Sequence, residues 1–458
     1  MCRTPLLTPI SIVLTASLSS FAPCQPRFEI IDLNDISYAG FASPWSINDE
    51  GVIAGVADFG VLDGFTPTVW IDGHAQPLRI VPGDDIGALV GANLNGLAVG
   101  ESTWIEERPN LLIFHSTATL WTSLDAVEID SLVTTGQDWD LLYCAGLNDN
   151  GVIIGTGRDP VLEEPRAWIF DSNTGALRDM GTLGGFSTEP YAINNSGVIV
   201  GQSWTSGGQQ HAFVLENGVM TDLGTLGGRD SRATDINESG LVVGGAQSPT
   251  SPELAVRWDG GQMFVLGTLG GNQSNANGVN NRGEIVGFST DVRHYAHMFY
   301  WRDGVMYNPV DHIPPGGGWG GRANALDIND AGQFVGTMYR ENRGDAPAVL
   351  TLVELELEGP LPGSAGQFNE VTVSGAAPGS LLTLVFGDGP GLRRIPGCPG
   401  APILIDEPLR AAVANADGNG VAVIRGFVPA SARGRAVRLQ AVERSRCRVS
   451  NVIEHTFF

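Results

Sequence analysis

The chain has 458 residues, 62 of them glycine, and a formal net charge of −24 with a pI of about 4.5. This length allows a large domain plus a smaller one, and the ordinary hydrophobic content excludes a disordered chain. The acidity argues against a nucleic-acid partner, because proteins that bind a phosphate backbone need a basic surface.

The first 24 residues are typical of a secretory signal peptide. Arg3 supplies a positive charge, and residues 6–22 form an apolar run. Because this run is short and no second span follows it, we expect no transmembrane span and cleavage within Ala22–Gln25. The sequence therefore predicts a secreted protein, extracellular or attached to the cell envelope. The alternative that Cys24 is lipidated stays open, although the residues before it fit a lipobox poorly.

An apolar residue, an asparagine, two variable residues and a glycine recur between about residues 36 and 352. The asparagines are Asn48, Asn93, Asn148, Asn194, Asn237, Asn280 and Asn329, spaced by 43 to 55 residues. A period of this size indicates a repeat architecture. The asparagine can bond its own backbone and the glycine can adopt a positive φ, so we interpret the motif as a hairpin turn rather than a ring of ligands.

Each repeat contains four short strand signals. In the fifth repeat they are Arg232–Ile236, Leu241–Gly244, Leu254–Trp258 and Met263–Leu266. Residues that favour turns separate them, and no helical period competes. Four antiparallel strands in about 43 residues, repeated, predict the blades of a β-propeller.

The ends of the array predict a closed ring. The seventh repeat has only three strand signals, at residues 325–328, 333–336 and 348–352. Residues 28–33 stand before the first repeat and are similar to the fourth strand elsewhere, such as residues 219–223. We therefore predict an all-β fold in which residues 27–354 form a seven-bladed propeller of four-stranded blades, with the N-terminal strand completing the last blade.

The sequence GTLGG occurs at residues 181–185, 224–228 and 267–271. We interpret it as the joint between blades, since its glycines permit a sharp crossing. Together with the Ile-Asn-x-x-Gly turn and His211-Ala212-Phe213, it resembles the HAF family of extracellular bacterial repeat proteins over about residues 36–352. Repeats four to six match well, and repeats one, two and seven match loosely. The resemblance implies secretion and repetition, and it transfers no catalytic residues.

The pattern changes after the array. Residues 355–363 are interpreted as a linker, and residues 364–458 as a β-sandwich. Its strand signals are residues 370–374, 381–385, 403–405, 421–424, 436–442 and 449–457. Cys398 and Cys447 are predicted to form a disulfide in an oxidising exterior. Cys144 lies in an apolar strand pattern, which predicts a buried free thiol.

Known catalytic and cofactor motifs are missing from the sequence, so we predict no cofactor. His294 and His297 would point to opposite faces of a strand, so we predict no metal site. We expect the functional residues in the segments that vary most between repeats. These are the loops between second and third strands and the crossings between blades, which share one face of a propeller around the mouth of its central channel. The candidate ligand-binding residues there are Trp104, Trp139, Trp204, Trp319, Tyr339, Arg229 and Arg322.

The sequence therefore favours a monomeric, non-enzymatic module that binds an extracellular carbohydrate or protein. The alternative is a propeller-type glycoside hydrolase or polysaccharide lyase, with Asp138, Asp140, Glu189 and Asp230 as candidate catalytic residues. A glycosidase needs two carboxyl groups about 5–10 Å apart, which a sequence does not reveal. A purely structural envelope protein is the third possibility.

Overall fold

The computed structural model describes residues 26–34, 41–60, 65–108, 111–123, 125–160, 163–313, 316–395, 398–446 and 448–458. The predicted signal peptide, residues 1–24, lies outside these ranges. The described chain is all-β, as predicted, and the helices that are described over their whole length are short 3-10 turns: η1 (Ile129–Leu132), η2 (Pro309–His312), η3 (Ala430–Ala432) and η4 (Arg444–Arg446). In the described residues, no helix has the length and apolar character that crossing a membrane requires.

Six four-stranded antiparallel sheets are each built from four consecutive strands. They are sheet 1 with β2 (Phe41–Ile47), β3 (Ile53–Asp58), β4 (Thr66–Ile71) and β5 (His74–Pro77); sheet 2 with β6 (Ile86–Ala92), β7 (Leu97–Arg108), β8 (Leu111–Thr122) and β9 (Asp125–Glu128); sheet 3 with β10 (Asp140–Leu147), β11 (Val152–Arg158), β12 (Pro165–Asp171) and β13 (Ala176–Asp179). The others are sheet 4 with β14 (Gly184–Ile193), β15 (Ile199–Thr205), β16 (Gln210–Glu216) and β17 (Val219–Asp222); sheet 5 with β18 (Ser231–Ile236), β19 (Val242–Ala246), β20 (Leu254–Asp259) and β21 (Gln262–Gly267); sheet 6 with β22 (Gly270–Val279), β23 (Ile285–Asp291), β24 (Ala296–Arg302) and β25 (Val305–Tyr307).

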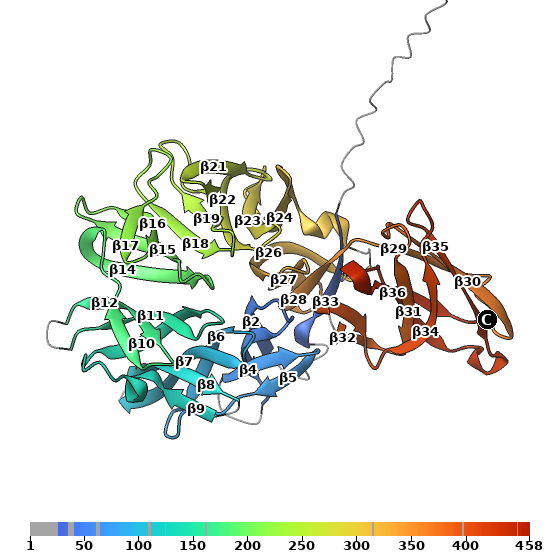
Figure 1. Ribbon diagram of the computed structural model, residues 1–458, viewed down its shortest axis with the longest axis horizontal. Coiled ribbons are helices and arrows are strands. Elements are labelled where there is room, and N and C mark those ends of the chain that lie inside the picture. The colour runs from blue at the N-terminus through green and yellow to red at the C-terminus, as the bar shows by residue number, and fades with distance from the viewer. Residues whose placement is uncertain are drawn as a thin grey trace, which may run out of the picture.

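Sheet 7 joins the two ends of the array. It contains β26 (Trp319–Ile328), β27 (Gln333–Arg340) and β28 (Gly344–Val353), and its fourth strand is β1 (Arg27–Asp32). β1 pairs antiparallel with β28, in the place that the sequence assigned to residues 28–33. The sheets lie around a common centre in a propeller-like arrangement, with the C-terminal strands to one side (Figure 1).

Apolar side chains fill the spaces between neighbouring sheets. Trp70 of sheet 1 packs in one cluster with Val335 and Val349 of sheet 7, and Trp168 of sheet 3 packs with Leu120 of sheet 2. Trp70 and Trp168 are fully buried. Burial of a large apolar side chain contributes about 1.5–3 kcal/mol, so these contacts hold each sheet against the next.

The asparagine turns do more than close hairpins. Asn237 Oδ1 accepts hydrogen bonds from the backbone N–H groups of Ser239 and Leu241, and Gly240 has a φ of 83°, as the turn interpretation requires. Asn237 Nδ2 also donates to Asn280 O in the next sheet, at 2.9 Å. Each asparagine of the series donates in the same way from Nδ2 to the backbone oxygen of the next one, in the order Asn48, Asn93, Asn148, Asn194, Asn237, Asn280 and Asn329. Asn329 then donates to Asn48 O at 3.1 Å. We call this closed series the asparagine ring.

The GTLGG segments join the fourth strand of one sheet to the first strand of the next. In the second copy, Gly224 and Gly227 have positive φ values of 71° and 90°. Thr225 Oγ1 accepts from Gly227 N–H and donates to Gly228 O, which fastens the crossing. The segment leads into β18 and not into a helix, so the interpretation as a joint agrees with the structure.

The C-terminal strands form two larger sheets around one shared apolar core, with a separate hairpin. They are β29 (Glu356–Leu361), β30 (Gln367–Ser374) and β35 (Ala422–Val428); β34 (Leu409–Asn415), β31 (Leu381–Gly387), β36 (Ala436–Glu443), β37 (Arg448–Val449) and β38 (Ile453–Thr456); and the hairpin β32 (Pro390–Ile395) with β33 (Cys398–Ile405).

The predicted linker needs correction. Most of residues 355–363 belongs to β29, which pairs with β30 and buries Leu357 in the shared core. The Gly-Pro pairs suggested a linker, but β29 is an edge strand, where proline is tolerated because one side needs no donor. β34 was also missed, because its sequence is rich in alanine and has a single β-branched residue, Val413, to signal a strand.

Cys144 is a buried free thiol, as predicted, and burial raises its pKa to about 12. The disulfide between Cys398 and Cys447 stays a prediction, because Cys447 and the side chain of Cys398 lie outside the described residues.

The C-terminal sheets pack directly on the part of the array that contains β1. Leu392 and Leu404 of the β32–β33 hairpin are buried in the same cluster as Ile31 and Trp70. Glu29 Oε1 accepts from Val452 N–H at 3.1 Å. The C-terminal part therefore covers the pairing that joins the two ends of the array.

Replacing Asn237 with alanine tests the asparagine ring. Asn237→Ala removes one inter-sheet donor and leaves the N–H groups of Ser239 and Leu241 without their acceptor. We expect the free energy of unfolding to fall by about 2–4 kcal/mol in urea denaturation followed by circular dichroism. The matched control is Ser239→Ala in the same turn, which removes only the hydrogen bond from the exposed Ser239 hydroxyl to Asn237 Oδ1, with an expected loss of about 0.5 kcal/mol. Equal losses in the two variants would contradict a structural role of the ring.

Candidate functional site

We call the space at the centre of the array, which the first strands of the seven sheets line, the channel. Two cavities, of about 290 and 330 Å³, lie along it, and residues next to all seven asparagine turns line them. The residues three positions before each asparagine all line the larger cavity: Trp45, Val90, Ala145, Tyr191, Thr234, Asn277 and Leu326. The first strand of every sheet therefore faces the channel.

A β-bulge explains why these residues reach the channel. In each first strand the pairing register shifts between the positions four and two residues before the asparagine, as between Ala233 and Asp235 in β18. A bulge adds an unpaired residue and redirects the side chains near it. The position three before the asparagine is thereby left outside the ladder, in the channel wall.

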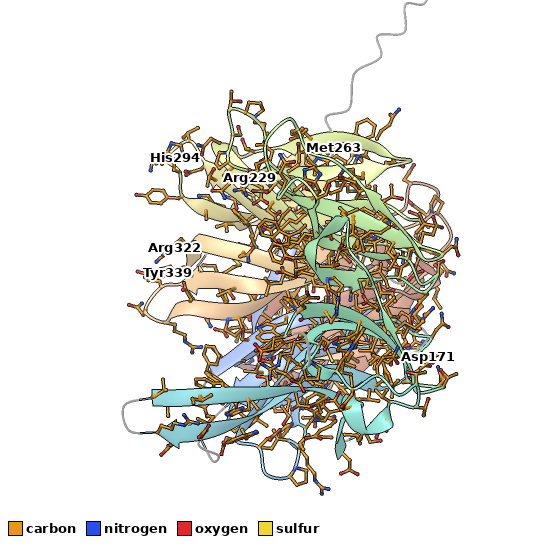
Figure 2. All side chains as sticks on the ribbon, turned by 90° about the vertical axis from the view of Figure 1, so that its left-hand side faces the viewer. Asp171, Arg229, Met263, His294, Arg322 and Tyr339 are labelled. Carbon is orange, nitrogen blue, oxygen red and sulfur yellow. The ribbon has the colours of Figure 1, made fainter. Side chains whose placement is uncertain are left out.

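The channel has two different mouths. Figure 2 shows Arg229, His294, Arg322 and Tyr339 on one side of the molecule and Asp171 on the opposite side. We call the first side, which carries the loops between second and third strands, the variable-loop face. The opposite side carries the asparagine turns, because Ser172, next to Asp171, donates from Oγ to Gly151 O of such a turn. We call it the asparagine-turn face.

The mouth on the asparagine-turn face is acidic. The residue after each ring asparagine is Asp49, Leu94, Asp149, Asn195, Glu238, Asn281 or Asp330. Side-chain oxygens of six of these accept the backbone N–H of the equivalent residue in the preceding sheet, as Asp49 Oδ1 does from Asp330 at 2.8 Å. Burial raises the pKa of Asp49, and the nearby carboxylates add to the effect. Because these oxygens serve as acceptors for the scaffold, this mouth is a poor candidate for a ligand site.

Two carboxylates lie inside the channel. Asp235 Oδ2 accepts from Val279 N–H, and Asp327 Oδ2 accepts from Ile47 N–H, each at 2.8 Å and each from the next sheet. Burial raises the pKa of Asp327 to about 6. Burial, with the charge of Asp327, raises the pKa of Asp235 well above its ordinary range. Across the described ranges, no three His, Cys, Asp or Glu side chains are placed to hold a metal ion.

A chain of polar contacts begins near the mouth on the variable-loop face. Glu189 Oε2 accepts from the Tyr191 hydroxyl at 3.0 Å and from Gln202 Nε2 at 2.7 Å. Glu189 and Tyr191 belong to β14, and Gln202 lies beside them on β15. Burial and the adjacent Glu189 carboxylate raise the pKa of Tyr191, which keeps its hydroxyl a donor.

The contacts continue in the next sheets. Arg232 donates from Nη2 to Glu253 Oε2 at 2.9 Å, and from Nε to Asn275 Oδ1 at 3.5 Å. A Cβ on Gly245 would lie 2.4 Å from Glu253 Oε1, so glycine leaves room for that carboxylate. Burial raises the pKa of Glu253, and Arg232 opposes the shift.

Electrostatic interactions connect the two groups, since the charges of Arg232 and Glu253 act on Tyr191. We call Glu189, Tyr191, Gln202, Arg232 and Glu253 the inner-wall cluster.

Exposed aromatic rings belong to the first strands of two other sheets. Trp45 lines the larger cavity and is 39% exposed. Tyr143 is 47% exposed and lies five residues before Asn148, the same repeat position as Glu189 and Arg232. The inner wall thus presents aromatic faces together with charged and amide groups that can bond a polar ligand.

The structure separates the predicted aromatic residues among several sheets. Trp104 is 42% exposed on the long β7–β8 hairpin and stacks on His115, with centroids 3.9 Å apart. Trp204 packs against Phe186. Trp139 packs against an apolar core, which makes it a structural residue.

The other predicted binding residues also lie apart from one another. Trp319 contacts the Arg340 guanidinium, 5.0 Å from its ring centroid. Arg229 donates to Gly208 O. Tyr339 and Arg322 are exposed on the variable-loop face (Figure 2).

Of the four predicted acids, only Glu189 belongs to the inner-wall cluster. Asp140 forms an ion pair with Arg158 at 2.7 Å, Asp230 accepts from Gln210 N–H at 3.0 Å, and Asp138 is exposed. Sequence reasoning missed Trp45, Tyr143, Tyr191, Arg232 and Glu253. Four of these five occupy the positions three or five residues before a ring asparagine, and comparing the repeats at those positions would have found them.

Asp327 makes stability depend on pH. Its pKa is raised from 3.8 to about 6 in the folded protein, so the folded state binds this proton more tightly than the unfolded state. The protonated Asp327 side chain therefore contributes to the free energy of unfolding at pH 4, and this contribution is lost as pH rises through about 6. The Asp327→Asn variant has no carboxyl group to ionise at this position. We expect the difference in the free energy of unfolding, variant minus wild type, to rise by about 1–3 kcal/mol between pH 4 and pH 7.

Urea denaturation at several pH values measures this difference. Ser46→Ala, at the same repeat position in sheet 1, is the uncharged control, and its difference from the wild type should not change with pH. A difference for Asp327→Asn that stays constant, or falls with pH, would contradict the raised pKa.

No protein-family model and no curated protein matches the chain. Among solved structures it is similar to TolB from Acinetobacter baumannii, with 12% identity, 66% of this chain and 63% of TolB covered, and a TM-score of 0.34. It is also similar to an oligogalacturonate lyase in complex with manganese (12% identity, 72% and 97% covered, TM-score 0.41). A third is the β-propeller domain of the Trilobed protease from Pyrococcus furiosus (11% identity, 63% and 90% covered, TM-score 0.35). These scores are too low to carry an argument about activity or ligand.

Proposed function

We propose that residues 27–354 form a closed seven-bladed β-propeller and that the C-terminal sheets form a β-sandwich attached to it. The pairing of β1 with β28, the asparagine ring and the apolar clusters between sheets support this interpretation. The signal-like N-terminus and the resemblance to HAF repeats support an extracellular location. In this proposal the protein acts as a monomer without a cofactor.

The function that we propose is binding of a carbohydrate at the channel mouth on the variable-loop face. The observation that carries it is the inner-wall cluster of sheets 4 and 5, together with the exposed rings of Trp45 and Tyr143 on the first strands of sheets 1 and 3. A sugar ring has an apolar face that packs on aromatic side chains, and its hydroxyls bond carboxylates, guanidinium and amide groups. Sheets 1, 3, 4 and 5 together offer both kinds of contact.

A catalytic role is the second candidate. Glu189 accepts from the Tyr191 hydroxyl in sheet 4, and Glu253 pairs with Arg232 in the neighbouring sheet 5, so two carboxylates lie on adjacent sheets. A glycoside hydrolase or polysaccharide lyase would use such a pair. In this version Glu253 replaces Asp138, Asp140 and Asp230 as the partner of Glu189, because those three residues lie in other contacts.

A glycan array with the mature protein tests the binding function. We expect selective binding of one group of extracellular glycans. Glu253→Gln removes the ionic partner of Arg232 and replaces one carboxylate oxygen with an amide donor. The affinity for the glycan should therefore fall about 10- to 100-fold, as expected for the loss of charged hydrogen bonds of about 1.5–3 kcal/mol. Trp45→Ala should weaken the same glycans. Phe368→Ala, an exposed aromatic of the C-terminal sheets, is the matched control.

Two outcomes would contradict the proposal. One is the absence of binding to every glycan tested. The other is binding that Phe368→Ala weakens as much as Trp45→Ala does. Release of reducing ends from a bound glycan, lost in both Glu189→Gln and Glu253→Gln, would establish the catalytic version instead.

A further inference from the structure

Another cavity lies inside the C-terminal part, outside the channel. Its volume is about 450 Å³, and it opens between the sheet of β29, β30 and β35 and the sheet of β34, β31 and β36. Its lining is mainly apolar, with Val371, Leu384, Phe386, Ile424 and Leu439 among the contributing residues. Pockets of this size and character commonly hold small ligands.

Small side chains at two sheet edges explain the cavity. β34 and β35 are the edge strands of their sheets, and no backbone ladder joins them. The side chains that face this gap are small: Ala412 on β34 and Ala432 on the adjacent η3, both only partly buried. Larger side chains at these two positions would fill the cavity. An apolar space of this kind is poorly hydrated, which favours an apolar occupant.

The polar groups of the cavity carry a net positive charge. Arg410 has an exposed side chain that makes no ion pair within the described residues. Arg435 also lines the cavity and contacts Asp388 at 3.3 Å, with both side chains exposed. The cavity is thus lined by two guanidinium groups and one carboxylate, whereas the whole chain has a net charge of −24. This end of the cavity is therefore suited to an anion.

We propose that this cavity binds a free single-chain amphiphile with an anionic headgroup, such as a fatty acid. The acyl chain lies among the apolar residues between the sheets, and the headgroup binds Arg410. A methylene group occupies about the volume share of a water molecule, roughly 30 Å³, so the cavity can hold a chain of about ten to fifteen carbons. This site is independent of the proposed carbohydrate site.

Calorimetric titration of the mature full chain with dodecanoate, below its micelle concentration, tests this site. We expect saturable binding of one molecule per chain. Ala412→Phe should fill the cavity and weaken binding more than about tenfold. Arg410→Ala should weaken dodecanoate about three- to tenfold and leave dodecan-1-ol unchanged, because only the charged headgroup needs the guanidinium.

The controls separate the cavity from the surface. Val413 lies on the same strand as Ala412, and its side chain points outward. The Val413→Phe variant should therefore bind dodecanoate like the wild type. Ala432→Phe fills the cavity from η3 and should repeat the effect of Ala412→Phe, with thermal unfolding confirming that each variant is folded.

Three results would overturn the proposal. They are the absence of saturable dodecanoate binding, equal binding by Ala412→Phe, Ala432→Phe and the wild type, and co-sedimentation with phosphatidylglycerol vesicles without binding of free dodecanoate. The last result would indicate a membrane surface as the ligand.

Discussion

The hydrogen bond from one turn asparagine to the backbone of the next sheet is the interaction on which this structure depends. Each ring asparagine fastens its own turn through Oδ1 and the neighbouring sheet through Nδ2, and the series returns from Asn329 to Asn48. A single side chain thus sets both a local and a long-range geometry. Only an amide side chain of this length supplies both the acceptor and the donor, which explains why the asparagine recurs while the surrounding sequence varies.

The ring also sets where chemistry is possible. It fixes the end of each first strand, and the bulge just before it turns selected side chains into the channel. At those positions the sheets carry different residues, among them Trp45, Tyr191 and Thr234. The scaffold and the candidate site therefore share the same strands, and the chemistry of the site can vary without a change in the fold.

Much of the fold could be predicted from the sequence. Strand signals in the fifth repeat, such as Leu254–Trp258, agree with the observed strand to within a residue, because alternation and turn residues are local signals. The partner of each Asn Nδ2 could not be predicted, since an acceptor 43 or more residues away leaves no local pattern. The β29 strand was hidden by prolines that only an edge position allows.

The site was harder to predict for a physical reason. Strand alternation assigns faces only while the register is unbroken, and each first strand contains a bulge that shifts it. The sequence therefore directed attention to predicted loops that carry Trp104 and Trp139, although Trp104 lies on β7. Four of the five cluster residues lie on β14, β15 and β18, and Glu253 lies just before β20. Glu189 was found because it follows a joint. Its partners Tyr191 and Gln202 were not found, and neither were Arg232 and Glu253 of the next sheet.

Hydrogen–deuterium exchange of the mature protein with and without its bound glycan tests the central claim most directly. If the fixed ring presents a variable wall for binding, the ligand should slow exchange at the beginnings of β10, β14 and β18 and leave the asparagine turns unchanged. Slowed exchange confined to the asparagine-turn face or to the C-terminal sheets would contradict it.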